Sequence, residues 1–406
     1  MKNFRVLALI AMTVMMGACG PKDPGLKDAY KNYFKIGVAV TGRDISDSLT
    51  AAIILKEYNS VTAENCMKPG ELHPAPGVWN FEEADKIADF CRANGIKMRG
   101  HNLVWHSQFA TWMFQAHDKN GNPIVELDEK GDTVFVEQRV FGRRRPDAQP
   151  GQRPTMETIM VPKYVSATKE EFYDSLRVHI NTVVNRYKDV IYCWDVVNEA
   201  MSDANDPDAS YEDSFRKSQA YRLCGDEFIK NAFIWAHEAD PNAGLFYNDY
   251  SAWTPSKRTY IYNMVKKLQS EGAPITGIGM QGHYNIFDNP TLEDFEKAIN
   301  MYLELVDDLQ ITEFDIRINE EAGGQLQFSR GEGQVYTEEI QAKQQKKYAD
   351  LFEIIRKYKN NISCVTFWNV NDSVSWLGAN NFPLLYDKDN QRKAVYYTVR
   401  DFKKQK

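Results

Sequence analysis

The hydrophobic residues of this chain gather in short, nearly continuous runs that alternate with longer amphipathic segments. Residues 191–197 are typical, because every side chain there except Asp195 is apolar or aromatic. Parallel strands that are covered by helices on both faces produce such runs. We therefore predict eight strands, at residues 36–40, 60–63, 96–101, 191–196, 244–247, 275–280, 309–312 and 364–367.

The amphipathic segments between these runs carry the start signals of helices. Asn80 with Glu83, and Thr168 with Glu171, have the spacing of a capping box, in which two side chains satisfy free backbone amides. Pro255 stands where a helix favours proline, at its first position. The pattern predicts helices at about 45–57, 81–94, 168–188, 217–239, 255–271, 292–306, 337–359 and 392–402.

Eight strands, each followed by a helix, predict a single-domain α/β fold, a closed (β/α)8 TIM barrel, over an open doubly wound sheet. The polar residues favour the barrel, because nearly every strand ends in side chains able to do chemistry. In a barrel these ends converge at one mouth, whereas in an open sheet they spread along an edge. The strand-end residues are Glu64, Asn65, His101, Asn198, Glu199, Asn248, Asp249, Gln281, His283, Glu313, Asp315 and Trp368.

One long segment interrupts the alternation, from about residue 116 to residue 165. It has no clear periodicity and contains several glycines and prolines. A loop of this length is usually functional or disordered. Because it leaves the carboxyl end of the third strand, we expect it to lie beside the mouth of the barrel.

The amino terminus has the pattern of an export signal. Lys2 and Arg5 precede an apolar run at residues 6–16 that is too short to span a bilayer. Small residues then lead to Cys19, which resembles the signal of a bacterial lipoprotein. We predict a signal peptide at 1–18, lipidated Cys19 with a tether to residue 29, and the barrel at 30–406, anchored to the outer membrane of a Gram-negative bacterium, on its periplasmic face or the cell surface. The alternative is an ordinary secretory signal with a chance cysteine.

Charge and cysteine content exclude several classes of protein. A formal net charge of -7 argues against a nucleic-acid partner, because no broad basic surface is available to neutralise phosphates. Five cysteines remain after Cys19, an odd number without a C-x-x-C spacing, which argues against a disulfide framework and a cysteine-zinc site. With 8 Trp and 21 Tyr, the chain has aromatic rings on which sugar faces can stack.

Two of the strand-end carboxyl groups stand out as a pair. Glu199 follows the aromatic run 191–197, and a carboxyl group held against aromatic side chains tends to stay protonated, as a general acid must. Glu313 ends another strand, with Asp315 two residues later on the same side. Hydrolysis of a glycosidic bond needs two such carboxyl groups on opposite faces of the scissile bond.

These residues lie in sequence blocks that resemble family 10 of the glycoside hydrolases, the endo-β-1,4-xylanases. The blocks occur in the order of the family over about residues 30–402. They are residues 64–69, 100–106, 194–199, 248–250, 281–283, 311–316, 367–368 and 372–376.

The resemblance implies a role for each matching residue. Glu199 is expected as the general acid/base and Glu313 as the nucleophile of a retaining mechanism that needs no metal or cofactor, with carboxyl groups about 5 Å apart. Asn198 is expected to bind the 2-hydroxyl of the reacting sugar, and His283, oriented by Asp315, to hold Glu313. Further contacts to xylan or xylo-oligosaccharides are expected from Glu64, Asn65, Lys68, His101 and Trp105 on the non-reducing side, Gln281 near Glu199, Tyr250 on the leaving side, His106 in support, and Trp368 and Trp376 as walls.

The chain departs from the family pattern in two places. Asn369 follows Trp368 where the family usually has glycine, and the segment at 116–165 is longer than usual. That segment contains Arg143, Arg144 and Arg145, which are either a solvated loop or a contact for acidic sugar decorations such as glucuronic acid.

Three other functions remain open from the residues alone. A barrel glycosidase for another β-glucan or for mannan would use the same carboxyl pair. A lipoprotein that only captures carbohydrate would need neither carboxyl group. A metal-dependent hydrolase would have to use His101, His106 and His283 with Asp195 or Glu313, although no H-x-H ligand pair is present.

Overall fold

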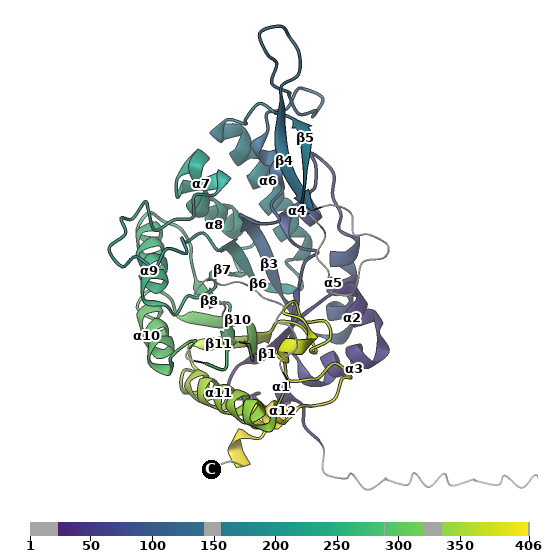
Figure 1. Ribbon diagram of the computed structural model, residues 1–406, viewed down its shortest axis with the longest axis vertical. Helices are drawn as coiled ribbons and strands as arrows, with labels where there is room; N and C mark the ends of the chain where they lie inside the picture. Colours follow the sequence, from purple (N-terminus) through teal and green to yellow (C-terminus); the bar gives the residue numbers. More distant parts are fainter. Residues whose placement is uncertain (1–22, 142–155, 288, 320–334, 405–406) are drawn as a thin grey trace, which may run out of the picture.

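A computed structural model describes residues 23–141, 156–287, 289–319 and 335–404. Eight parallel strands form a ring that closes where β10 pairs with β11, and helices surround the strands (Figure 1). This confirms the predicted TIM barrel. The strands of the ring are β1 (Lys35–Val40), β2 (Ser60–Ala63), β3 (Lys97–Trp105), β6 (Ile191–Asn198), β7 (Gly244–Asp249), β8 (Gly277–Met280), β10 (Asp308–Arg317) and β11 (Ile362–Phe367).

Each predicted strand is present, and β10 extends well past its predicted end. It continues far enough to pair in parallel with a short further strand, β9 (His283–Asn285). Between β8 and β9 the chain passes through Gly282, whose φ of 88° is a left-handed conformation that favours glycine. Asp315 thereby pairs with His283 in the strand register.

The helices pack their apolar faces on the strands, and the core fills the layer between them. Thr168 and Glu171 form the predicted capping box. The capping box at Asn80 is wrong, because the N-cap of α5 is Phe81, and the Asn80 side-chain amide donates to the Glu71 carbonyl. The helices are α1 (Leu26–Ala29), α2 (Gly42–Ser46), α3 (Ser48–Glu57), α4 (Pro69–Leu72), α5 (Glu82–Asn94), α6 (Lys169–Tyr187), α7 (Gln219–Cys224), α8 (Glu227–Ala239), α9 (Pro255–Ser270), α10 (Leu292–Tyr302), α11 (Glu338–Lys357) and α12 (Ala394–Arg400).

Two predicted helices are each a pair of helices. The segment predicted at 217–239 is α7 and α8, which are separated at Gly225 with a φ of 62°. The segment predicted at 45–57 is α2 and α3, separated at Asp47, whose side chain accepts from Thr50 N and caps α3. Hydrophobic periodicity continues across both breaks, so it does not reveal them.

The long segment after β3, expected as a loop, contains a β-arm instead. Strands β4 (Phe135–Phe141) and β5 (Met156–Pro162) pair in antiparallel fashion and project away from the barrel (Figure 1). Phe135 and Met160 are 52% and 58% exposed. Because apolar residues are exposed on this hairpin, it lacks the alternation that marks a half-buried strand. Arg143, Arg144 and Arg145 lie outside the described residues.

The first described residue, Asp23, is tied to the barrel. Its carboxylate forms ion pairs with Lys56 at 2.8 Å and Arg392 at 2.6 Å. Within the predicted tether, residues 26–29 form α1, which packs on α3. Cys19 lies outside the described residues. In the part of the chain that is described, no helix is long and apolar enough to cross a membrane.

Candidate active site

Glu199 stands directly after β6, in a backbone conformation that is unusual for its residue type. Its φ of 56° is left-handed, which costs a residue other than glycine on the order of 1–3 kcal/mol. Two neutral donors hold its carboxyl group: Trp105 Nε1 lies 2.7 Å from Oε2, and Gln281 Nε2 lies 2.8 Å from Oε1. Such strain persists where the surroundings fix the conformation, and it is typical of functional positions.

Burial and neighbouring charge keep Glu199 protonated to a higher pH than an ordinary glutamate. Removal from water raises the pKa of its carboxyl group, and the negative charge of Asp249 raises it further. The hydrogen bonds from Gln281 and Trp105 act in the opposite direction without reversing the shift. A raised pKa suits a group that has to donate a proton at neutral pH.

Glu313 lies inside the barrel mouth on β10, and its environment has the opposite effect. Burial alone would raise the pKa of this carboxyl group, but hydrogen bonding to His283, the nearby His101 and the Asn248 amide more than offset it and lower the pKa. Asn248 Nδ2 lies 3.0 Å from Oε1, and His283 Nε2 lies 3.2 Å from Oε2. Glu313 is therefore ionised, as a nucleophile must be.

His283 lies between two carboxyl groups. Its Nδ1 is 2.9 Å from Asp315 Oδ2, opposite the contact of its Nε2 with Glu313. Burial alone would lower the pKa of this imidazole, but the charges of Asp315 and Glu313 raise it to about 10. The ring is thus an imidazolium that donates to both carboxylates. Trp376 Nε1 donates to the same Asp315 oxygen at 2.9 Å, which fixes the carboxylate from its other side.

A chain of side-chain amides joins the two glutamates. Gln281 Nε2 donates to Glu199 and, at 3.3 Å, to Asn198 Oδ1. Asn248 Nδ2 donates to the same Asn198 oxygen at 2.9 Å and to Glu313. Glu199 and Glu313, 114 positions apart (313 − 199), are therefore held at one rim through three amides. The separation of their carboxyl groups, predicted at about 5 Å, stays a prediction.

The residues predicted for the non-reducing side gather at the same rim. Lys68 Nζ donates to Asn65 Oδ1 at 2.7 Å and lies 4.9 Å from the centre of the Trp105 ring. Burial lowers the pKa of Lys68, while the charges of Glu313, Glu64 and Glu199 oppose that shift.

Asn369 connects two of the predicted contact residues. Its φ of 92° is the left-handed geometry that glycine adopts freely, consistent with the glycine usual in the family. Unlike glycine, it has a side chain, whose Nδ2 donates to Glu64 Oε2 at 2.9 Å and whose Oδ1 accepts from Trp376 N at 3.2 Å. Asn369 therefore ties the end of β2 to the loop that carries Trp376.

The remaining predicted residues line the mouth. His101 Nδ1 lies 2.9 Å from Asp195 Oδ2, and the Trp368 ring packs edge-on against His101. His106 Nδ1 is 4.0 Å from Glu199 Oε2, and burial, with the charge of Arg216, lowers the pKa of this imidazole to about 4. Among the described residues, no group of three or more His, Cys, Asp or Glu side chains is arranged to hold a metal ion.

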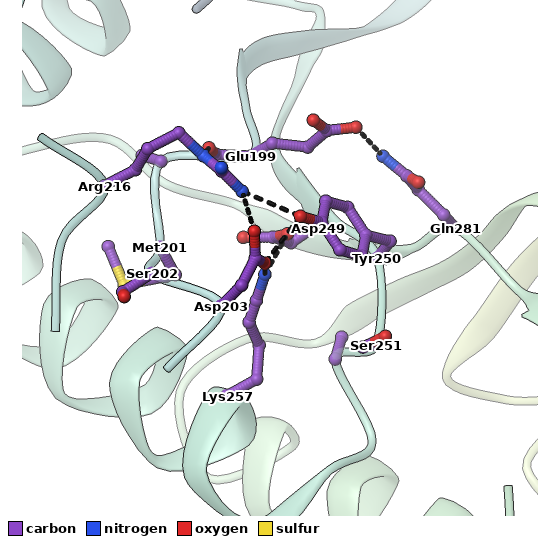
Figure 2. Close-up of polar contacts among 12 residues, drawn as sticks. Glu199, Met201, Ser202, Asp203, Arg216, Asp249, Tyr250, Ser251, Lys257 and Gln281 are labelled. Carbon is purple, nitrogen blue, oxygen red and sulfur yellow. Dashed lines mark hydrogen bonds and ion pairs between the residues drawn. The ribbon is translucent and has the colours of Figure 1, made fainter. Parts of the chain in front are cut away.

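Tyr250 belongs to a polar cluster beside Glu199 that sequence reasoning missed. Figure 2 shows Arg216 and Lys257 on either side of Asp203, with Tyr250 against them. The Tyr250 hydroxyl donates to Asp203 at 2.5 Å and accepts from Arg216 at 2.8 Å. Asn248 was among the strand-end residues predicted from sequence, although no role was assigned to it. Asp203 and Arg216 come from the irregular segment between β6 and α7, where no periodicity marks a residue.

Comparisons with known proteins place this geometry in a family. The model of glycosyl hydrolase family 10 matches residues 25–134 and 158–402. The chain is 50% identical over 385 residues to an endo-1,4-β-xylanase/feruloyl esterase of Xylanibacter ruminicola, covering 93% of this chain and 47% of that protein. It is 39% identical over 382 residues to endo-1,4-β-xylanase B of Paenibacillus barcinonensis, covering 93% and 97% of the two chains.

Solved structures agree with the sequence relatives. A psychrophilic family 10 endo-β-1,4-xylanase superimposes with a TM-score of 0.76 at 46% identity, over 93% of this chain and 99% of that one. The chain spans about half the length of the Xylanibacter protein and of a Caldicellulosiruptor xylanase, 47% of each. The family match omits residues 135–157, which include all of β4.

Proposed function

Because the chain belongs to glycosyl hydrolase family 10, we propose that it is a retaining endo-1,4-β-xylanase that hydrolyses internal bonds of xylan. One observation carries the proposal: two glutamates at one rim, joined through three amides, have their pKa values shifted in opposite directions. A protonated and an ionised carboxyl group at one site are what double displacement requires.

The reaction proceeds in two steps. Glu313 attacks the anomeric carbon while Glu199 protonates the departing glycosidic oxygen, which leaves a covalent glycosyl-enzyme. Glu199, now ionised, removes a proton from water, and the water displaces Glu313. Glu313 accepts hydrogen bonds from His283 and Asn248, which stabilise its carboxylate in the free enzyme and again when it departs. The Oδ1 atom of Asn198 accepts from two amides, so its Nδ2 is the part left to donate to the 2-hydroxyl of the sugar.

Xylan is the proposed substrate because relatives along nearly the whole chain are endo-1,4-β-xylanases, and a solved relative at 34% identity holds xylotriose. We expect the bulky indoles of Trp368 and Trp376, which pack beside His101 and His283, to disfavour the hydroxymethyl group that distinguishes glucose from xylose. Rates on xylan, cellulose and mannan oligosaccharides of equal length test this choice. We expect xylan to be hydrolysed at least tenfold faster. Equal rates on two of these polymers would contradict it.

The pKa shifts predict a wide bell-shaped pH profile of kcat/KM. Activity requires Glu313 ionised and Glu199 protonated. Because the pKa of Glu313 is lowered, activity is lost only in more acidic solution than for an ordinary glutamate; because the pKa of Glu199 is raised, activity persists to higher pH. The two limbs belong to the coupled pair rather than to single residues.

The matched control for this profile is Glu199→Gln, assayed on an activated aryl xylobioside that needs no protonation. The alkaline limb should disappear from kcat/KM while the acidic limb stays. If both limbs survive the substitution, another group is responsible for the alkaline one.

The β-arm is not expected to take part in catalysis. Residues 135–157 lie outside the family match, and β4 and β5 contact mainly each other. Val134 O accepts from Lys163 N at 2.8 Å, so an Asn-Gly turn can replace residues 135–162. The shortened enzyme should retain kcat/KM on xylan within about twofold. A loss beyond tenfold in a protein that unfolds at an unchanged temperature would place the arm in substrate binding.

We also propose that Cys19 carries a lipid that holds the enzyme on the outer membrane of a Gram-negative bacterium. The basic, apolar and small residues before Cys19 support this, and Asp23, four positions later (23 − 19), is fixed beside Lys56 near the amino end of β2. The barrel is then held close to the lipid surface. In Triton X-114 extraction of cells expressing the full chain, the enzyme should enter the detergent phase, and Cys19→Ala should move it to the aqueous phase. Aqueous partition of both would refute the anchor.

A further inference from the structure

The turn at Glu199 is held through its backbone by a buried tyrosine. The amides of Ala200 and Met201, which directly follow the left-handed residue, donate to the Tyr247 hydroxyl at 3.0 and 3.2 Å. Tyr247 is fully buried on β7. With phenylalanine at this position, two buried amides would have no acceptor, and such groups are costly to leave unpaired.

The same hydroxyl donates its proton to Asp249. This carboxylate is fully buried, and its other oxygen lies 3.2 Å from Lys257 Nζ. Two accepted hydrogen bonds and one donated bond use the full capacity of the Tyr247 hydroxyl. The position of the Tyr247 hydroxyl, and therefore of the two amides that donate to it, depends on the ion pair between Asp249 and Lys257.

The carbonyl side of the turn is held as well. Arg216 Nε donates to the Glu199 carbonyl at 3.1 Å, and its Nη2 lies 3.0 Å from Asp203 Oδ2. Lys257 lies 2.8 Å from the other Asp203 oxygen, so the groups on both sides of the turn meet in one network (Figure 2). The members of this clamp are Tyr247, Asp249, Lys257, Asp203 and Arg216.

Glu313 is held by a separate set of groups. One partner of its carboxylate, Asn248, belongs to the amide chain, and the other, His283, is held by Asp315. Successive side chains on a strand point to opposite sides, so on β7 Tyr247 and Asp249 face the turn while Asn248 faces Glu313. A change in the clamp should therefore impair proton transfer by Glu199 and spare nucleophilic attack by Glu313.

We propose that Tyr247, Asp249 and Lys257 are positioning residues for general acid catalysis, because they fix the left-handed turn from which the Glu199 carboxyl group reaches the departing oxygen. This inference rests on the proposed role of Glu199. The clamp residues act on Glu199 in two ways. They hold the backbone of its turn, and their charges change the electrostatic potential at its carboxyl group. Asp249, whose negative charge favours the protonated acid, is the member that contributes to both.

The test compares substrates whose leaving groups differ in their need for a proton. We would measure kcat/KM for 2,4-dinitrophenyl and phenyl β-xylobioside with the wild type, Tyr247→Phe and Asp249→Asn. The dinitrophenolate departs without protonation, so its rate should fall at most threefold in either variant. The phenyl substrate needs the acid, and its rate should fall about 10- to 100-fold, the size of effect that a displacement near 1 Å produces.

A buried tyrosine far from the clamp supplies the control. Tyr30 is fully buried and its hydroxyl donates to the Val399 carbonyl. Tyr30→Phe should lower the unfolding temperature without changing the ratio of the two rates. Equal losses on both substrates in Tyr247→Phe, or no loss on either, would overturn the proposal and leave the clamp a structural feature only. If that variant does not fold, Asp249→Asn, which keeps an acceptor for Tyr247, decides by the same ratio.

The pH profile gives a second readout that a structural role would not move. His106, Arg216, Lys68 and Glu313 also lie near Glu199 and remain in Asp249→Asn. Loss of one negative charge should shift the alkaline limb for phenyl β-xylobioside to lower pH. An unchanged limb would contradict the part assigned to Asp249. A wild type inactive on both substrates would overturn the proposed function itself.

Discussion

Replacing Glu313 with alanine is expected to lower kcat on xylan by about 10⁴- to 10⁶-fold, the range seen when an enzyme loses its nucleophile. The vacated space lies beside His283 and Asn248, which would still donate to an anion there. Azide should therefore occupy it and attack the anomeric carbon of an activated aryl β-xylobioside. Because this is a single displacement, the product should be the α-xylobiosyl azide.

Formation of the α-azide distinguishes loss of the nucleophile from misfolding as the cause of the lost activity. Glu304→Ala removes an exposed carboxyl group that accepts from Tyr262 and should leave kcat unchanged. A Glu313→Ala protein that is folded, inactive and unresponsive to azide would place the nucleophile elsewhere. Retention of more than one per cent of wild-type activity would do the same.

Replacing Glu199 with alanine should have a large effect that depends on the leaving group. On xylan, kcat/KM should fall by about 10³- to 10⁴-fold, near the upper range for loss of a general acid. On 2,4-dinitrophenyl β-xylobioside, kcat/KM should change less than tenfold, because that leaving group departs unprotonated. Glu313 still forms the glycosyl-enzyme, which then accumulates because water is no longer activated.

Azide distinguishes this variant from Glu313→Ala. Azide needs no general base, so it should raise kcat on the activated substrate and give the β-xylobiosyl azide, the opposite anomer. An equal loss of kcat/KM on both substrates would contradict the acid/base role. The same α-azide from both variants would show that the two carboxyl groups do not lie on opposite faces of the sugar.

The glutamates also bear on the alternative of a lipoprotein that captures carbohydrate without cleaving it. Pure binding needs no protonated carboxyl group beside an ionised one. The environment of Glu199 raises the pKa of its carboxyl group, while the contacts around Glu313 lower the pKa of the second carboxyl group. A site that only binds carbohydrate would not require the two donors to Glu199, Trp105 and Gln281, or the charged His283 beside Glu313.

Much of the barrel could be predicted from sequence because its strands are buried on both faces. The run from 191 to 197 is β6 nearly residue for residue. Glu199 and Glu313 followed from the rule that strand ends converge, a property of closed parallel sheets. The β-arm did not follow, since most of the described side chains of its strands are exposed and the strands carry no regular alternation.

The clamp around Glu199 could not be predicted for a different reason. In the sequence Tyr247 is one more apolar residue of a buried strand, and nothing there indicates that its hydroxyl accepts from Ala200 and Met201. Arg216 reaches the Glu199 carbonyl from an irregular segment 17 positions away (216 − 199). Contacts of this kind depend on three-dimensional placement, which neither periodicity nor spacing encodes.

The stereochemistry of hydrolysis tests the pairing of Glu199 and Glu313 most directly. Anomer-resolved NMR of xylopentaose hydrolysis, followed from the first seconds, reports which anomer appears before mutarotation mixes the two. If Glu313 forms a covalent intermediate that Glu199 then helps water to displace, the β-anomer appears first. An initial α-anomer would mean that water attacks directly, and the assignment of Glu313 as nucleophile would be wrong.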